Sequence, residues 1–191
     1  MEAVATPRHV LMDEDDPRVR LLIADDDRAA RSLLASCARD ALGEILVFEA
    51  VDGAEAVRLG LQQSPEIALL DINMPRLGGI EAAVTLRELK PHMRVALQTG
   101  DPLTHRDRAH EHRLPLFGKL ELERTLAWLE AQVAWFTHPP DPDGPRKRSF
   151  VCGACGYGAL RETAPGRCPM CHAEHAWIEA AWRSSRMLFA R

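Results

Sequence analysis

The chain has 191 residues, of which 46% are hydrophobic and 27% charged, and its formal net charge is −4. This length accommodates one full domain and a smaller second one. No apolar run is long enough to cross a bilayer, and the N-terminus has no hydrophobic signal region, so we expect a cytoplasmic protein outside the membrane. Residues 1–18 include four consecutive acidic residues and are expected to form a disordered acidic arm.

Strands and helices are predicted to alternate from residue 19 onward. The strands are predicted at 19–24, 45–50, 67–70, 94–98 and 114–117, and the helices at 28–42, 54–63, 79–90, 102–112 and 120–136. Such alternation predicts an α/β fold with a five-stranded, doubly wound parallel sheet covered on both faces. Pro115 lies inside the fifth predicted strand, and proline is tolerated in a strand at a sheet edge. The stripe of the first helix expected to pack on the sheet is Ala30, Leu33, Leu34, Cys37 and Ala41.

Polar residues stand where four of these strands are expected to end. They are Asp25, Asp26, Asp71, Thr99 and Lys119. The carboxyl ends of the strands line the ligand crevice of an open α/β sheet, so we expect these residues to converge. Three clustered carboxylates repel one another unless a cation joins them, and hard oxygen ligands suit Mg²⁺. A hydroxyl and an ammonium group beside them would face an incoming anion, an arrangement suited to phosphorylation of a carboxylate.

The simpler interpretation of the acidic run is a helix start, because aspartate favours the N-cap and the first turn. It accounts for Asp27, which precedes the first predicted helix. It does not account for a second strand that ends in Asp71. Thr99 or Lys119 alone would be an ordinary strand-end or surface residue, so the prediction depends on their joint occurrence.

Residues 19–136 resemble the receiver domain of two-component response regulators. The matching stretches are Leu-Leu-Ile-Ala-Asp-Asp-Asp at 21–27, Leu-Leu-Asp-Ile-Asn-Met-Pro-Arg-Leu-Gly-Gly at 69–79, Leu-Gln-Thr-Gly at 97–100, and Lys119. The resemblance implies a flavodoxin-like fold. It also implies a phosphoacceptor that works with a histidine kinase or phosphotransfer protein and is not itself an enzyme, apart from self-dephosphorylation.

Residue roles follow from this resemblance by position. Asp71 would accept the phosphoryl group, and Lys119 would bind it. Mg²⁺ would be held by Asp25, Asp26 and Asp71, with the backbone carbonyl of Asn73 as a further ligand. Thr99 would report the presence of the phosphoryl group.

The sequence departs from the receiver pattern around Lys119. The receiver lysine is normally followed by proline through a cis peptide, whereas Leu120 follows here. A cis bond before a residue other than proline costs roughly 2.5–4 kcal/mol, so we expect a trans bond and a reshaped loop. Leu116 occupies the position of the usual aromatic switch residue, so signalling through that switch is expected to be weak.

The last predicted helix is longer than a receiver requires. Its apolar stripe consists of Leu122, Leu126, Leu129, Val133 and Phe136, most of which is expected to be core. The outer end of the stripe is a candidate contact for a homodimer or for a second domain. Residues 137–148 contain four prolines and a glycine, which predicts a stiff linker.

Two Cys-x-x-Cys pairs, separated by twelve residues, follow the linker. They consist of Cys152 with Cys155 and Cys168 with Cys171. Each pair can present two thiolates to one tetrahedral ion, and disulfides are the less frequent use of cysteine inside cells. The pairs therefore predict a four-Cys metal site.

Residues 149–178 resemble the rubredoxin-like domain of rubrerythrins and, more generally, zinc ribbons. The similarity rests on Phe-Val-Cys-Gly-Ala-Cys-Gly-Tyr at 150–157 and Ala-Pro-Gly-Arg-Cys-Pro-Met-Cys at 164–171. We expect a small metal-knuckle β domain at 149–191 with an aromatic core of Phe150, Tyr157 and Trp177. Four thiolates suit both zinc and iron. Zinc is expected here because rubrerythrins also carry a di-iron helical bundle, of which the sequence has no sign.

Charge is unevenly divided along the chain. Residues 144–191 carry eight basic and three acidic side chains, a net charge of +5, and the remainder carries −9. A basic C-terminal tail permits nucleic-acid contact, docking on the acidic domain, or merely solvated arginines.

The function expected from the sequence is a phosphorylation-gated binding module with a downstream protein partner, or nucleic acid as the second choice. The alternatives are a receiver-controlled electron-transfer protein with iron, and a metal ribbon that only stabilises a single-domain regulator.

Overall fold

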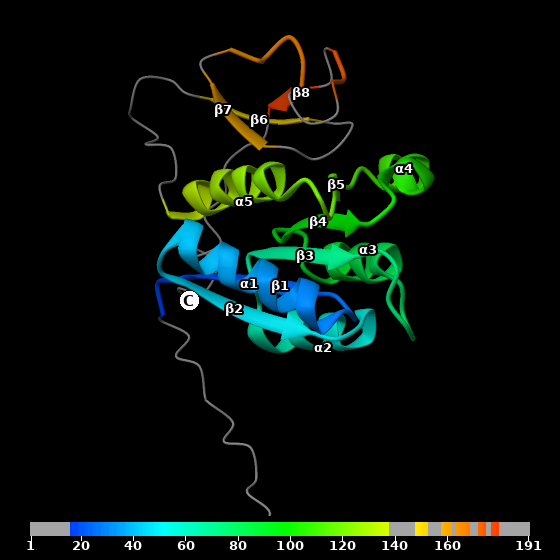
Figure 1. The fold of residues 1–191 in the computed structure, drawn as a ribbon. Coiled ribbons are helices and arrows are strands. Elements are labelled where there is room, and N and C mark those ends of the chain that lie inside the picture. Colours follow the sequence, from blue (N-terminus) through cyan, green and yellow to red (C-terminus); the bar gives the residue numbers. More distant parts are fainter. Residues whose placement is uncertain are drawn as a thin grey trace, which may run out of the picture.

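A computed structural model describes residues 16–137, 148–152, 158–161, 163–168, 172–174 and 177–179. Its larger part is a five-stranded sheet in the order β2-β1-β3-β4-β5, with all neighbours parallel. The strands are β1 Val19–Ala24, β2 Ile45–Ala50, β3 Ile67–Asp71, β4 Arg94–Thr99 and β5 Leu116–Gly118. The helices are α1 Arg28–Leu42, α2 Gly53–Gln63, α3 Gly79–Leu89, α4 Pro102–Glu111 and α5 Leu122–Thr137. The predicted parallel α/β sheet is confirmed (Figure 1).

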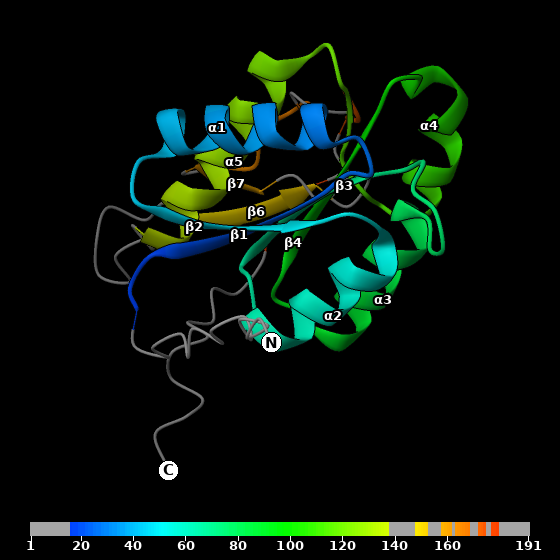
Figure 2. The ribbon, with the colours of Figure 1, turned by 60° about the horizontal axis from the view of Figure 1, so that its bottom comes forward.

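Helices cover both faces of this sheet (Figure 2). Alternate side chains of β1 point to opposite faces: Leu22 belongs to the cluster under α2 and α3, and Leu21 to the cluster under α1 and α5. Both leucines are fully buried. The helix α4 contributes mainly Ala109 to the first cluster, and the other residues of this helix are largely exposed. The two apolar layers fix the central strands, so the carboxyl ends of β1 and β3 lie next to each other.

Two predicted details are wrong. The fifth strand begins at Leu116, so Pro115 precedes the strand instead of lying within it. The first helix is rotated relative to the predicted stripe: its buried residues are Arg31, Leu34, Ala35 and Ala38. Leu33 is 61% exposed. The prediction followed hydrophobicity alone and therefore placed the arginine on the outside.

A second, three-stranded antiparallel sheet has the order β7-β6-β8. Its strands are β6 Arg148–Cys152, β7 Gly158–Arg161 and β8 Trp177–Glu179. Strand β7 contacts α5, so this sheet lies beyond the helix on the side away from the large sheet (Figure 1). Phe150, expected in the small core, is buried, and Trp177 is half-buried. Tyr157, most of the acidic arm, most of the linker and the basic tail beyond 179 lie outside the described residues.

Within the described residues, no helix combines the length and apolar character needed to cross a membrane.

Candidate functional site: an acidic pocket at the carboxyl end of the sheet

Three carboxylates meet at the ends of two neighbouring strands. Asp25 and Asp26 follow β1, and Asp71 is the last residue of β3. One ligand oxygen of each lies within 4.8 Å of the others. Asp25 and Asp71 are only 3% and 4% exposed, whereas Asp26 faces solvent. The structure therefore brings together the three carboxylates that the sequence singled out.

Lys119 lies in the loop after β5 and reaches into this pocket. Its Nζ is 2.8 Å from Oδ2 of Asp25 and 3.3 Å from Oδ2 of Asp71. Burial alone would lower the pKa of Lys119, but the hydrogen bond with Asp25 and the charge of Asp71 raise that pKa above its ordinary value. The ammonium group is therefore charged at neutral pH and partly neutralises the pocket.

The surroundings of Asp71 disfavour its ionised form. Burial raises the pKa of its carboxyl group, Lys119 opposes this shift, and the charge of Asp25 adds to it. Its Oδ1 is buried and has no hydrogen-bond partner among the described residues. A buried carboxylate oxygen without a donor fits a cation ligand. The all-oxygen donor set fits Mg²⁺, and Asn73, two residues after Asp71, is exposed at the rim.

Thr99 ends β4, the strand next to β3, and is fully buried. Its Oγ1 accepts a hydrogen bond of 3.3 Å from the N–H of Asp101. Its carbonyl accepts one of 2.8 Å from the N–H of Lys119. The backbone of β4 thus anchors the loop that carries the lysine, and the threonine lies one strand from Asp71.

The loop around Lys119 is closed by two hydrogen bonds between Gly118 and Glu121. The described residues contain no cis peptide, so the Lys119–Leu120 bond is trans, as expected. The N–H of Gly118 donates to Oε2 of Glu121 (3.0 Å), and the N–H of Glu121 donates back to the carbonyl of Gly118 (2.9 Å). The hydrogen bond from Gly118 lowers the pKa of the Glu121 carboxyl group. This reciprocal turn positions Lys119 and leaves Leu120 99% exposed.

The loop from β3 to α3 packs too closely for a side chain at Gly79. A Cβ at this position would overlap the carbonyl oxygen of Asp71, whereas a Cβ at Gly78 would meet mainly the flexible carboxylate of Glu81. We expect Gly79→Ala to lower the free energy of unfolding by about 1–3 kcal/mol, because fixed backbone must move. The matched control Gly78→Ala should cost clearly less. Urea denaturation of both variants checks this, and equal losses would contradict it.

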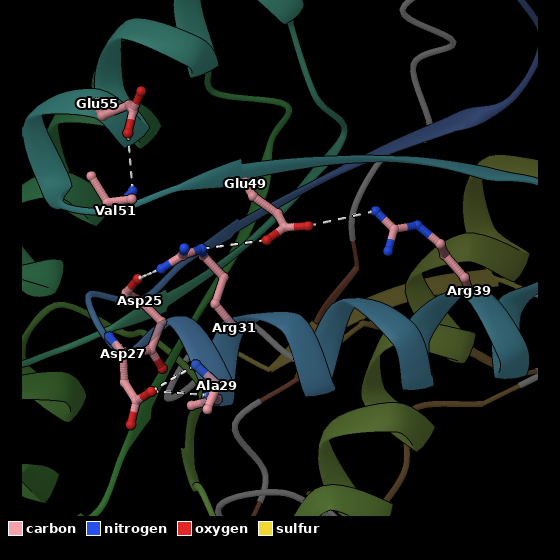
Figure 3. A network of polar contacts seen from close by, with 9 residues as sticks. Asp25, Asp27, Ala29, Arg31, Arg39, Glu49, Val51 and Glu55 are labelled. Atoms are coloured by element: carbon pink, nitrogen blue, oxygen red, sulfur yellow. Dashed lines mark hydrogen bonds and ion pairs between the residues drawn. The ribbon is translucent and has the colours of Figure 1, made fainter.

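Sequence reasoning missed Arg31, one turn into α1. This side chain is 9% exposed, and its Nη1 donates a 2.6 Å hydrogen bond to the backbone carbonyl of Asp25 (Figure 3). In the sequence, Arg31 follows the acidic end of the first predicted strand by about one helical turn. This position alone does not distinguish it from a charged residue on the surface of a helix.

Two of the four predicted metal-binding cysteines are described. Cys152 ends β6 and is 1% exposed, and Cys168 is fully buried. Cys155 and Cys171 lie outside the described residues. The chain reverses tightly after Cys168: the N–H of His172 donates to the Cys168 carbonyl, and the N–H of Cys168 donates to the Ala173 carbonyl, both at 2.9 Å. His172 has a φ of 60°, which closes the turn.

The fold has counterparts among known proteins. Residues 21–111 match the family model described as the response regulator receiver domain. The response regulator MprA of Mycobacterium sp. (strain KMS) is 33% identical over 132 residues, covering 66% of this chain and 56% of MprA. The response regulator domain of Thermotoga maritima CheB is similar in structure, with a TM-score of 0.51, 25% identity and coverage of 65% of this chain and 99% of that one.

Some relatives are much longer than the matched segment. Protein-glutamate methylesterase/protein-glutamine glutaminase 4 of Myxococcus xanthus is 42% identical over 69 residues, which is 36% of this chain and 19% of that protein. The chain thus spans about a fifth of this relative and just over half of MprA. The enzyme name belongs to a protein matched over a small share of its length, so it does not decide whether this chain is an enzyme.

Proposed function

Because residues 21–111 form a response regulator receiver domain, we propose that the chain acts in a two-component phosphorelay in which Asp71 accepts the phosphoryl group. One observation carries the assignment to this residue. Asp71 places in the acidic cluster a buried oxygen with no hydrogen-bond partner in the described part of the chain, and its second oxygen lies 3.3 Å from the Lys119 ammonium group. Asp25 is already engaged with Lys119 and with the N–H of Asp27, and Asp26 faces solvent.

The reaction is a transfer from phosphohistidine to a carboxylate. An Asp71 oxygen attacks phosphorus, the new O–P bond forms, and the P–N bond of the histidine kinase or phosphotransfer protein breaks. Asp25, Asp26, Asp71 and the Asn73 carbonyl would hold Mg²⁺, which would supply positive charge for the phosphoryl oxygens. Lys119, which follows the carboxyl end of β5, contributes a positive charge from the same edge of the sheet. The Thr99 hydroxyl is the group that would bond the transferred phosphoryl and report its arrival.

Chemical phosphorylation tests this proposal. We expect the intact chain, incubated with acetyl phosphate, to gain the mass of one phosphoryl group in the presence of Mg²⁺ and to gain almost none in its absence. Peptide mapping should place the label on Asp71. Labelling at another residue, or labelling indifferent to Mg²⁺, would refute the assignment.

The proposed output is an interaction module at 149–191, held together by one Zn²⁺ on Cys152, Cys155, Cys168 and Cys171. Support comes from the burial of Cys152 and Cys168 and from the backbone hydrogen bonds that join Cys168 to His172 and Ala173. Because β7 contacts α5, a change in α5 caused by phosphorylation would alter the docking of this module. A homodimer through the last receiver helix would use the same helix, so docking of β7 and dimerisation would compete. A protein is the partner we favour, with nucleic acid second.

The rival function is electron transfer by iron at the same four cysteines, controlled by the receiver. The two functions differ in the metal: a colourless zinc protein supports the interaction module, whereas a red protein with thiolate-to-iron charge-transfer bands supports the rival. Neither function makes the chain an enzyme.

A further inference from the structure

We propose that Arg31 is a positioning residue for the Mg²⁺ site and that it acts by holding the peptide between Asp25 and Asp26. This inference rests on the proposed function, because it assumes that the acidic pocket binds Mg²⁺. The guanidinium group lies between α1 and β2, where it contacts the backbone carbonyl of Asp25 and the carboxylate of Glu49 (Figure 3).

Each polar group of Asp25 has a partner. Its N–H donates to the Ala50 carbonyl at 3.2 Å, and its Oδ1 accepts the N–H of Asp27 at 2.9 Å. Its Oδ2 lies 2.8 Å from Nζ of Lys119. The fourth group, the carbonyl, accepts the hydrogen bond from Arg31 at 2.6 Å. Because Asp25 is buried, loss of this donor would leave a backbone carbonyl unsatisfied and favour rotation of the peptide.

The same peptide determines where Asp26 points. A peptide unit is planar, so a hydrogen bond that fixes the Asp25 carbonyl also fixes the N–H and the Cα of Asp26. The Asp26 side chain is exposed, and within the part of the chain that the structure describes it makes no hydrogen bond or ion pair of its own. Its direction relative to Asp25 and Asp71 therefore depends on the backbone that Arg31 holds.

Arg31 is itself fixed by a charge on the edge strand. Its Nε lies 3.3 Å from Oε2 of Glu49 in β2, and the second oxygen of Glu49 lies 3.7 Å from Nη2 of Arg39. The guanidinium of Arg31 is nearly buried, whereas the side chain of Arg39 is 49% exposed. A planar fork can contact a carboxylate and a carbonyl at once, which a single ammonium group does less well. Arg39 pairs with the same glutamate but does not reach the pocket, so it is a matched control.

The test compares Mg²⁺ affinity in Arg31→Met and Arg39→Met. Isothermal titration calorimetry with MgCl₂ should show a dissociation constant raised about tenfold or more in Arg31→Met, the size typical of residues that orient metal ligands. Arg39→Met should bind as the wild type does. In acetyl phosphate labelling, Arg31→Met should need more Mg²⁺ for half-maximal rate, and its rate at saturating Mg²⁺ should approach that of the wild type.

The outcomes separate this inference from the proposed function. A wild-type chain that neither binds Mg²⁺ nor becomes labelled refutes the proposed function. A functional wild type with equal Mg²⁺ affinity in both arginine variants refutes only the role of Arg31. If Arg31→Met fails to fold by circular dichroism, Glu49→Ala decides: it removes the side-chain partner of Arg31 from a partly exposed site, and unchanged Mg²⁺ affinity in this variant overturns the inference.

Discussion

Replacing Asp71 with asparagine is expected to abolish phosphoryl labelling and to make the folded protein more stable. The amide has nearly the shape of the carboxylate but cannot form an acyl phosphate. Burial raises the pKa of Asp71, so the folded state resists its ionisation. A carboxyl group with a raised pKa contributes its stability below its unfolded value, and that contribution is lost as the pH rises through the folded value. At neutral pH the charge of Asp71 is therefore a cost that asparagine removes.

Thermal unfolding at pH 7 without Mg²⁺ measures the expected gain in stability of Asp71→Asn. The Tm of Asp71→Asn should exceed that of the wild type by a few degrees, since each kcal/mol shifts the Tm of a domain of this size by roughly 4 °C. The advantage should shrink as the pH falls through the raised pKa of Asp71, because the wild-type carboxyl group then becomes protonated. Asp107→Asn, the same charge change on exposed α4, should retain labelling and show no such gain. A wild-type level of labelling in Asp71→Asn, or a lowered Tm, would contradict the role assigned to Asp71.

The position of the acidic pocket could be predicted because it depends on strand ends. Asp25 and Asp71 each follow a run of buried apolar residues, and parallel neighbours bring their carboxyl ends together. Lys119 could be placed by its position after the fifth strand, although that strand is shifted by two residues at its start. These predictions needed only hydrophobic runs and the topology of the sheet.

Arg31 could not be predicted because its burial depends on two partners from other elements of the fold. The predicted apolar stripe of the first helix includes Leu33 and Ala41, which face solvent, and omits Arg31, since hydrophobicity alone disfavours an arginine inside. In the folded chain Glu49 and the Asp25 carbonyl offset the cost of burying the guanidinium. The turn closed by Glu121 could not be predicted either. The lack of a proline after Lys119 predicts a different loop but does not specify the hydrogen bonds of that loop.

The second large effect is expected from removal of the metal. Chelation should unfold β6, β7 and β8 while the parallel sheet stays folded. Three strands of three to five residues bury too little apolar surface to offset chain entropy of about 1–2 kcal/mol per residue. Structural zinc can supply about 10–16 kcal/mol near neutral pH. The large sheet has its own two apolar layers and does not need this contribution.

Hydrogen exchange with mass spectrometry on the intact chain resolves the two sheets. After treatment with a chelator, amides of β6 and β8 should exchange freely, and amides of β1 and β3 should remain protected. Cys168→Ser should behave as the chelated protein does, with less than one equivalent of metal by elemental analysis. Cys37→Ser, which alters a half-buried cysteine of α1, should keep one equivalent. Continued protection of β6 and β8 after complete loss of metal would show that packing against α5 holds the small sheet, and would remove the structural role proposed for the four cysteines. A stoichiometric iron with a reversible reduction potential would replace the interaction module with the electron-transfer function.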